Sequence, residues 1–120
     1  MNKHTVVIGA APDQEKYSYK AVTDLKNNGH TVYALGIKQG NINGVEILVD
    51  RPKIENIDTV TLYIGATRQD DWKDYLLSLN PKRVIFNPGT ENAVLEQELQ
   101  AKGIECVEGC TLVMLSIGNY

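Results

Sequence analysis

The chain has 120 residues, of which 42% are hydrophobic and 22% are charged, and its formal net charge is −3. This composition is typical of a folded domain with its own core, so we expect one domain over residues 1–120. No stretch of Lys and Arg forms the basic patch that a nucleic-acid interface needs, and no apolar run approaches the roughly 18 residues of a membrane span. Residues 1–4 lead directly into the first predicted strand, so we expect no signal peptide and a cytoplasmic protein without nucleic-acid or membrane partners.

A short apolar strand, a turn of small residues and a helix open the chain. Residues 5–8 are Thr, Val, Val and Ile, which predicts a buried strand, and residues 9–12 form a turn whose small side chains leave the main chain accessible. An amphipathic helix is predicted over residues 18–28, with Ser18 as its N-cap and Gly29 as the left-handed residue after its end. A strand, a tight turn and a helix start in this order bring backbone N–H groups together around an anion, usually a phosphate.

Strand and helix patterns alternate along the rest of the chain. Further strands are predicted at residues 31–35, 59–64, 83–86 and 104–107, and further helices at residues 69–79 and 92–102. The helical side chains expected to face the sheet are Trp72, Tyr75, Leu76, Leu79, Val94, Leu95 and Leu99. The segment 37–57 lacks a regular period, and we expect one short extended piece there, at residues 45–49. The apolar residues 111–115 are expected to pack against the domain or to bury a dimer surface.

This alternation is typical of an α/β fold, and we predict a five-stranded parallel sheet with helices on both faces. In such sheets a ligand binds beyond the carboxyl ends of the strands, near the point where the strand order switches. Predicted strands end at Gly9, Gly36, Gly65 and residues 87–89. Because these ends share one edge of a parallel sheet, the sequence predicts a cleft there, although glycine after a strand is also ordinary turn chemistry.

The motifs of two common nucleotide sites are missing from this edge. The turn at residues 9–12 is not a G-x-G-x-x-G fingerprint, and the second strand ends in Leu35, Gly36 and Ile37, without the carboxylate that holds the ribose of NAD. NAD is therefore disfavoured, and a P-loop is excluded because the chain has no G-x-x-x-x-G-K-[ST] motif. Lys38 follows the second strand and either meets a phosphate, for example on a phosphorylated ribose, or is a solvated loop residue; its spacing fits both.

No catalytic or metal site can be assembled from the sequence. The histidines are His4 and His30, and neither is predicted at the strand-end edge, so no Ser-His-Asp or Cys-His arrangement is expected there. Cys106 and Cys110 lack the spacing and the partner ligands of a zinc site. Cys106 fits a buried strand position, and for Cys110, in a loop, a packing role is favoured over a reactive thiol. We therefore predict no catalytic and no metal-binding residues.

Several short motifs along the chain are informative in their order and spacing. They are the turn at residues 9–12, Ser18 and Tyr19 at the helix start, residues 29–33, residues 42–45, the strand from Asp58, residues 87–92, and Gly109 with Cys110. In this order they resemble the small stand-alone coenzyme A-binding protein family, whose members are similar to the N-terminal nucleotide-binding domain of the succinyl-CoA synthetase α subunit. The resemblance covers essentially the whole chain.

The resemblance implies a Rossmann-like three-layer sandwich that binds coenzyme A across the strand ends. It implies that the turn and the helix start cradle the phosphates, that the loop after the second strand lines the nucleotide end, and that the end of the third strand borders the adenine or the pantetheine arm. The residues implied, in that order, are Gly9, Ala10, Ala11, Pro12, Ser18 and Tyr19; Gly36 and Lys38; and Ile64 and Gly65. Two positions depart from the family pattern: Ala11 stands where serine is common, and Gly36 stands within a loop that commonly reads Val-Asn-Pro.

These observations lead to one leading hypothesis and two alternatives. The leading hypothesis is a non-catalytic protein that binds coenzyme A or an acyl-CoA as a carrier, sensor or regulatory module, with a homodimer or a partner protein as further expectations. The first alternative is an enzyme subunit that uses another nucleotide, with Cys110 or Lys38 in its chemistry. The second alternative is an interaction domain that kept the fold and lost the ligand, which Ala11 and Gly36 make conceivable.

Overall fold

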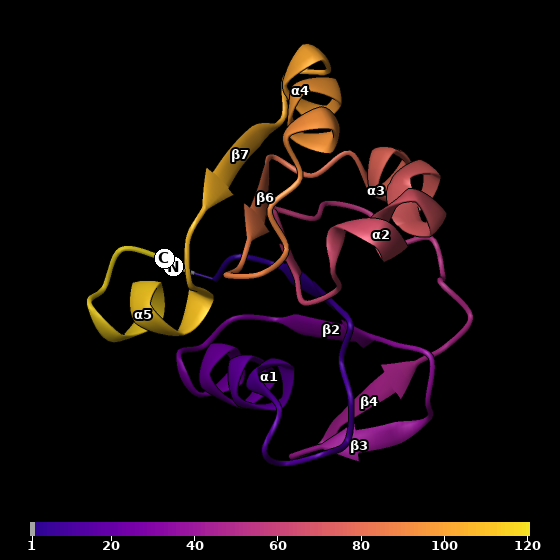
Figure 1. The fold of residues 1–120 in the computed structure, drawn as a ribbon. Helices are drawn as coiled ribbons and strands as arrows, with labels where there is room; N and C mark the ends of the chain where they lie inside the picture. The colour runs from indigo at the N-terminus through magenta and orange to yellow at the C-terminus, as the bar shows by residue number, and fades with distance from the viewer. Residues whose placement is uncertain (1) are drawn as a thin grey trace.

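Strands and helices alternate along the chain in the computed structural model, which describes residues 2–120 (Figure 1). The strands are β1 (Thr5–Ile8), β2 (Val32–Leu35), β3 (Gly40–Ile42), β4 (Val45–Leu48), β5 (Thr59–Leu62), β6 (Arg83–Phe86) and β7 (Glu105–Glu108). The helices are α1 (Tyr17–Asn27), α2 (Ala66–Gln69), α3 (Lys73–Leu79), α4 (Ala93–Ala101) and α5 (Thr111–Ser116), and the 3₁₀ turn η1 (Asp70–Trp72) joins α2 to α3. No helix within residues 2–120 is long and apolar enough to cross a membrane.

All seven strands belong to one sheet, in the order β3-β4-β2-β1-β5-β6-β7. Every neighbouring pair is parallel except β3 and β4, which are antiparallel. The prediction of an α/β fold is confirmed, but the prediction of a five-stranded, wholly parallel sheet is wrong. The sheet is mixed and larger than predicted because residues 40–48 form a hairpin at its edge.

The β3–β4 hairpin turns at Asn43 and Gly44, whose φ angles are 49° and 92°. Two successive residues with positive φ form the type I′ turn, the preferred two-residue connection between antiparallel strands. Ile42 of β3 and Ile47 of β4 are buried and pack in the core beside α1. The Asn-Gly pair was the available signal for this hairpin, inside a segment for which only one extended piece was predicted.

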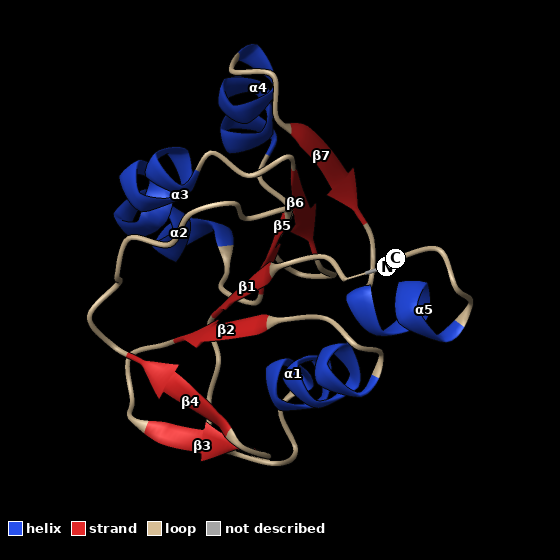
Figure 2. Cartoon of the chain, turned by 180° about the vertical axis from the view of Figure 1, so that it is seen from behind, coloured by secondary structure: helices blue, strands red, loops and turns tan. Residues whose placement is uncertain are grey.

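Helices cover both faces of the sheet (Figure 1 and Figure 2). Successive side chains of a strand point to opposite faces. Val6 and Ile8 of β1 therefore pack in one core with η1, α3 and α4, whereas Val7 packs in a second core with α1 and α5. Every residue of β1, β5 and β6 is buried, including the threonines of β5, because both faces of these central strands are covered.

Two predictions about helix residues are wrong. Lys16, not Ser18, is the N-cap of α1; it provides no side-chain cap, and Ser18 is buried as the second residue of the helix. Val94 does not face the sheet, because Leu95 and Leu99, one helical turn apart, fill that contact and leave Val94 68% exposed. The left-handed residue predicted after α1 is confirmed, since Gly29 has a φ of 85°.

The two remaining helical segments also differ from the prediction. The helix expected at residues 69–79 begins earlier, at Ala66, and is divided by the 3₁₀ turn η1. The apolar segment 111–115 packs down as predicted, but as the short helix α5, whose Leu115 contacts the core beside α1. These short helices depend on tertiary packing, because isolated helices of this length are unstable in water.

Cys106 is expected to react slowly with thiol reagents. It is half-buried in β7 and packs against the larger core. Burial, followed by the charges of Glu96 and Glu105, raises the pKa of its thiol to about 11. Because only the thiolate reacts, its ionised fraction at pH 8 is about 0.1%, roughly a hundredth of that of a thiol with a pKa of 9.0. Iodoacetamide labelling with peptide mass spectrometry measures this rate, and the urea-unfolded chain is the control. Equal rates for Cys106 in the folded and unfolded chains would contradict the prediction.

Candidate functional site

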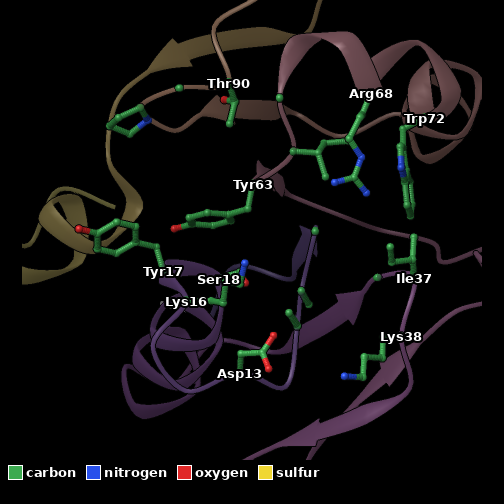
Figure 3. A pocket seen from close by; sticks show the side chains of 18 residues that line it. Asp13, Lys16, Tyr17, Ser18, Ile37, Lys38, Tyr63, Arg68, Trp72 and Thr90 are labelled. Atoms are coloured by element: carbon green, nitrogen blue, oxygen red, sulfur yellow. The ribbon is translucent and has the colours of Figure 1, made fainter.

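A pocket of about 480 Å³ lies at the carboxyl edge of the sheet (Figure 3). It is formed by the loops that follow β1, β2, β5 and β6 together with the start of α1. Neighbouring strands end level with one another, since Ile8 pairs with both Leu35 and Leu62, and Leu62 pairs with Phe86. The loops that leave these residues therefore start side by side, at the edge where the sequence predicts a cleft.

Eight of the ten predicted site residues line this pocket. They are Gly9, Ala10, Ala11, Ser18, Gly36, Lys38, Ile64 and Gly65. Pro12 and Tyr19 are outside the lining: Pro12 lies against Gly40 of β3, and Tyr19 packs against the core beside α1. The end of a predicted strand shows at which edge of the sheet the following loop lies. It does not show which side chains of that loop face the pocket, and this is why Pro12 and Tyr19 were included in the prediction. That the eight residues bind a ligand stays a prediction.

The pocket also contains side chains that the sequence had not assigned to the site. Among them are Lys16, Tyr17, Tyr63, Arg68, Trp72 and Thr90. Arg68 was missed because the helix was expected to begin at Gln69, whereas α2 begins directly after Gly65. Trp72 was expected to face the sheet, and it both packs in the core and lines the pocket. A basic residue so soon after the glycine that ends a strand was the available signal.

The start of α1 presents backbone donors to the pocket. The lining residues there whose N–H groups have no hydrogen-bond partner within residues 2–120 are Ala11, Asp13, Tyr17 and Ser18. Gly9 and Ala10, by contrast, both donate their N–H groups to the carbonyl oxygen of Leu35, each at 2.9 Å. Within the predicted phosphate turn, the free donor is therefore that of Ala11. The uncapped helix start, at the positive end of the helix dipole, supplies those of Tyr17 and Ser18.

Three cationic side chains border the pocket, those of Lys16, Lys38 and Arg68. None of them takes part in either of the two ion pairs formed within residues 2–120. Among the described lining residues, Asp13 is the one that carries a carboxylate. A concave site with this excess of positive charge attracts anions.

One end of the pocket is apolar and is built around Trp72. Figure 3 shows Trp72 beside Arg68 and above Ile37. Arg51 places its guanidinium carbon 3.6 Å from the centre of the Trp72 ring and donates to the carbonyl oxygen and the carboxylate of Asp71, each at 2.7 Å. Trp72 is 3% exposed, whereas Ile37 is 76% exposed. An exposed apolar side chain below an arginine and an indole suits a heteroaromatic ring.

The other end of the pocket carries Tyr63, whose ring points toward Tyr17, with Thr90 above it (Figure 3). The Tyr63 hydroxyl is buried and has no hydrogen-bond partner within residues 2–120. Burial is the main reason that the pKa of Tyr63 is raised above its usual value. The phenol therefore stays neutral at physiological pH and provides no base.

The histidines and cysteines lie outside the pocket lining. His30 is at the opposite edge of the sheet, where its Nδ1 accepts the N–H of Lys3 at 2.9 Å. Cys110 is the N-cap residue of α5 and does not line the pocket. Within residues 2–120, no group of three or more His, Cys, Asp and Glu residues could hold a metal ion. The lining residues offer hydrogen-bond donors, positive charge and apolar surface.

Comparisons with known proteins agree with this fold. A sequence profile for a family described as "CoA binding domain" matches residues 3–116. A crystal structure described as an uncharacterized protein is 51% identical to the chain, with a TM-score of 0.98 over 100% of this chain and 99% of that one. A hypothetical protein from Pyrococcus horikoshii OT3 is 19% identical, with a TM-score of 0.86 over 97% of this chain and 83% of that one. No curated protein matches the chain.

A larger enzyme contains a domain of the same fold. It is the dinucleotide-forming acetyl-coenzyme A synthetase 1 of Ca. Korarchaeum cryptofilum, solved in complex with phosphate and ADP. It is 17% identical, with a TM-score of 0.70 over 90% of this chain and 26% of that one. The family resemblance read from the sequence is confirmed by the profile, which covers nearly the whole chain. The protein therefore belongs to the CoA-binding domain family.

Proposed function

We propose that the protein binds coenzyme A, free or as an acyl thioester, in this pocket, as a single domain without chemistry of its own. The observation that carries the proposal is the meeting of the uncapped start of α1 with the unpaired side chains of Lys16, Lys38 and Arg68. Coenzyme A carries a diphosphate and a ribose 3′-phosphate, and such groups are bound by helix N-termini and by basic side chains. Membership of the CoA-binding domain family supports the proposal.

The nucleotide half of the ligand matches one part of the pocket. The diphosphate would accept hydrogen bonds from Ala11 and the first turn of α1, beside Lys16. The 3′-phosphate would lie between Lys38 and Arg68, and the adenine would lie at the apolar end formed around Trp72. The pantetheine arm would then extend past the other end of the pocket, toward Tyr63 and Thr90.

The two departures from the family pattern are compatible with this arrangement. Ala11 lacks the serine hydroxyl, but its backbone N–H is free, and one neutral hydrogen bond contributes only about 0.5–1.5 kcal/mol. At Gly36 a Cβ atom would overlap the carbonyl oxygen of Ala10, so this backbone has no room for the asparagine of the pattern. The contacts to the nucleotide in this region would come from Lys38 and Arg68 instead.

The absence of chemistry is the finer part of the proposal. It is supported by the position of Cys110 and of the histidines outside the pocket lining. A carrier, a sensor and a regulatory module would all use a pocket of this kind. Binding of another nucleotide would favour the enzyme subunit instead, and binding of none would favour the interaction domain.

Coenzyme A and acetyl-CoA are expected to raise the melting temperature of the protein, whereas NAD, NADP and ATP are expected to have a smaller effect. A ligand at 100 times its Kd stabilises the fold by about 2.7 kcal/mol, which is several degrees for a domain of this size. Thermal-shift assays with isothermal titration calorimetry measure this. No shift with either coenzyme A compound at millimolar concentration would contradict the proposed function.

The Lys38→Ala variant is the matched test of the 3′-phosphate contact. It should weaken coenzyme A binding by about 1 kcal/mol, roughly fivefold, which is the range for an exposed charge pair. It should leave 3′-dephospho-CoA unaffected, and Lys102→Ala, on the exposed end of α4, serves as the control. An equal loss of affinity for coenzyme A and for 3′-dephospho-CoA would show that Lys38 does not contact the 3′-phosphate.

A further inference from the structure

Gln69, the last residue of α2, is a polar side chain with no exposure to solvent. Its Nε2 donates to the carbonyl oxygen of Ile64 at 3.0 Å and to that of Thr90 at 2.7 Å. Its Oε1 accepts from Nδ2 of Asn92 at 3.0 Å, which fixes the orientation of the amide. Both amide hydrogens and the amide oxygen are therefore used, so the buried group is fully satisfied.

The two carbonyl oxygens that Gln69 holds belong to different walls of the pocket. Ile64 follows β5 and Thr90 follows β6, and both residues line the pocket. Gln69 itself is not a lining residue. Its amide thus connects two loops that line the site, although Gln69 does not itself line the space that a ligand would fill.

The loop after β6 has its own internal bonds, which make it a rigid unit. Both the N–H and the Oγ1 of Thr90 donate to the carbonyl oxygen of Asn87, at 2.9 Å and 2.8 Å. Asn92 caps α4, because its Oδ1 accepts the N–H of Leu95 at 3.1 Å. Gln69 bonds to this unit at Thr90 and at Asn92. Asn87 ties this unit to the end of β5 through the carbonyl oxygen of Leu62, and the bond from Gln69 to Ile64 adds the second tie, which reaches the loop after β5.

We propose that Gln69 is a positioning residue, which sets the distance between Ile64 and Thr90 and thereby the affinity for the pantetheine arm of coenzyme A. The inference rests on the proposed function, because it needs a ligand that passes between these two walls. Substitution of Gln69 releases two buried carbonyl oxygens that water or a shift of the loops must then satisfy. The nucleotide half of the ligand, held beyond this point by α1, Lys38 and Arg68, does not depend on that distance.

The test compares two ligands on matched variants. Gln69→Met keeps the length of the side chain but removes both donors, and Gln69→Glu keeps its shape but replaces the donating nitrogen with oxygen. Gln97→Met and Gln97→Glu make the same changes at an exposed position of α4. Calorimetric titrations with coenzyme A and with adenosine 3′,5′-bisphosphate are run well below the melting temperature of each variant.

Gln69→Met is expected to lower the affinity for coenzyme A about tenfold and the affinity for adenosine 3′,5′-bisphosphate less than twofold. Both Gln97 variants should bind the two ligands with wild-type affinity. Gln69→Glu should show the same selective loss or a larger one; if it does not fold, Gln69→Met decides alone. A merely structural role would lower the affinity for both ligands equally, and that result would overturn the inference, as would unchanged coenzyme A binding by Gln69→Met. If the wild-type protein itself binds no coenzyme A, the proposed function and this inference both fail.

Discussion

The Asn87→Leu variant is expected to lose about 2–5 kcal/mol of stability, because it leaves buried polar groups unpaired at about 1–3 kcal/mol each. Asn87 is 2% exposed and lies directly after β6. Its Nδ2 donates to Oγ1 of Thr61 at 2.6 Å and to the carbonyl oxygen of Leu62 at 2.8 Å, and its Oδ1 accepts the N–H of Thr111 at 2.9 Å. Leucine has a similar size and can make none of these bonds.

The loss should come from two of these partners in particular. The hydroxyl of Thr61 keeps a bond to Oγ1 of Thr111 at 2.8 Å, whereas no other side chain within residues 2–120 bonds to the carbonyl oxygen of Leu62 or to the N–H of Thr111. The start of α5 should therefore loosen as well. Urea denaturation followed by circular dichroism measures the free energy of unfolding, and Asn27→Leu, on the exposed end of α1, is the control. A loss of less than about 1 kcal/mol in the free energy of unfolding would contradict the prediction, because it would show that water can replace the hydrogen bonds of the Asn87 amide.

The Gly36→Ala variant is expected to abolish coenzyme A binding and to lower stability by about 1–3 kcal/mol, as overpacking of a tight contact does. A Cβ atom at Gly36 would overlap the carbonyl oxygen of Ala10 and lie 3.3 Å from Cγ2 of Ile47. The first neighbour is main chain and cannot rotate away. It belongs to the turn after β1, so relief of the overlap must displace the turn that lines the pocket and leads to the start of α1.

Calorimetric titration and thermal unfolding of Gly36→Ala test the two parts of this prediction. Gly109→Ala is the matched control, because a Cβ atom there meets its nearest neighbour, Cγ1 of Val107, at an ordinary 3.6 Å. We expect at least a hundredfold loss of affinity for coenzyme A in Gly36→Ala and none in the control. Wild-type affinity in a folded Gly36→Ala variant would mean that the turn can move without harm to the site.

The pattern of elements was predictable because it depends on local chemistry. Apolar runs that end at a glycine or at the turn of residues 87–89 predicted the positions of β1, β2, β5 and β6, and the run at residues 104–107 predicted β7, although the exact ends differ. The hairpin of β3 and β4 was only half predicted, because strands of three or four residues carry too few side chains to show a period of two. The Asn43-Gly44 pair was its one strong signal.

The candidate site was predictable to the extent that it consists of strand ends. Gly9, Gly36 and Gly65 line the pocket because parallel strands in register bring their carboxyl ends to one edge of the sheet. This rule can be applied to the sequence alone once the strands have been predicted. Arg68 and Trp72 follow a different rule. Their direction depends on where α2 begins and on the 3₁₀ turn η1, and helix boundaries are the least certain part of any prediction from sequence.

The opening strand and turn illustrate this division. Residues 5–8 are apolar and are followed by small residues, and this local pattern was enough to predict a strand, a turn and an anion site near the next helix. It could not show that the N–H groups of Gly9 and Ala10 are taken by the carbonyl oxygen of Leu35, because that bond joins segments distant in the sequence. The donors left for a ligand, and the bonds of Gln69 and Asn87 that shape the walls, exist only once the strands have paired.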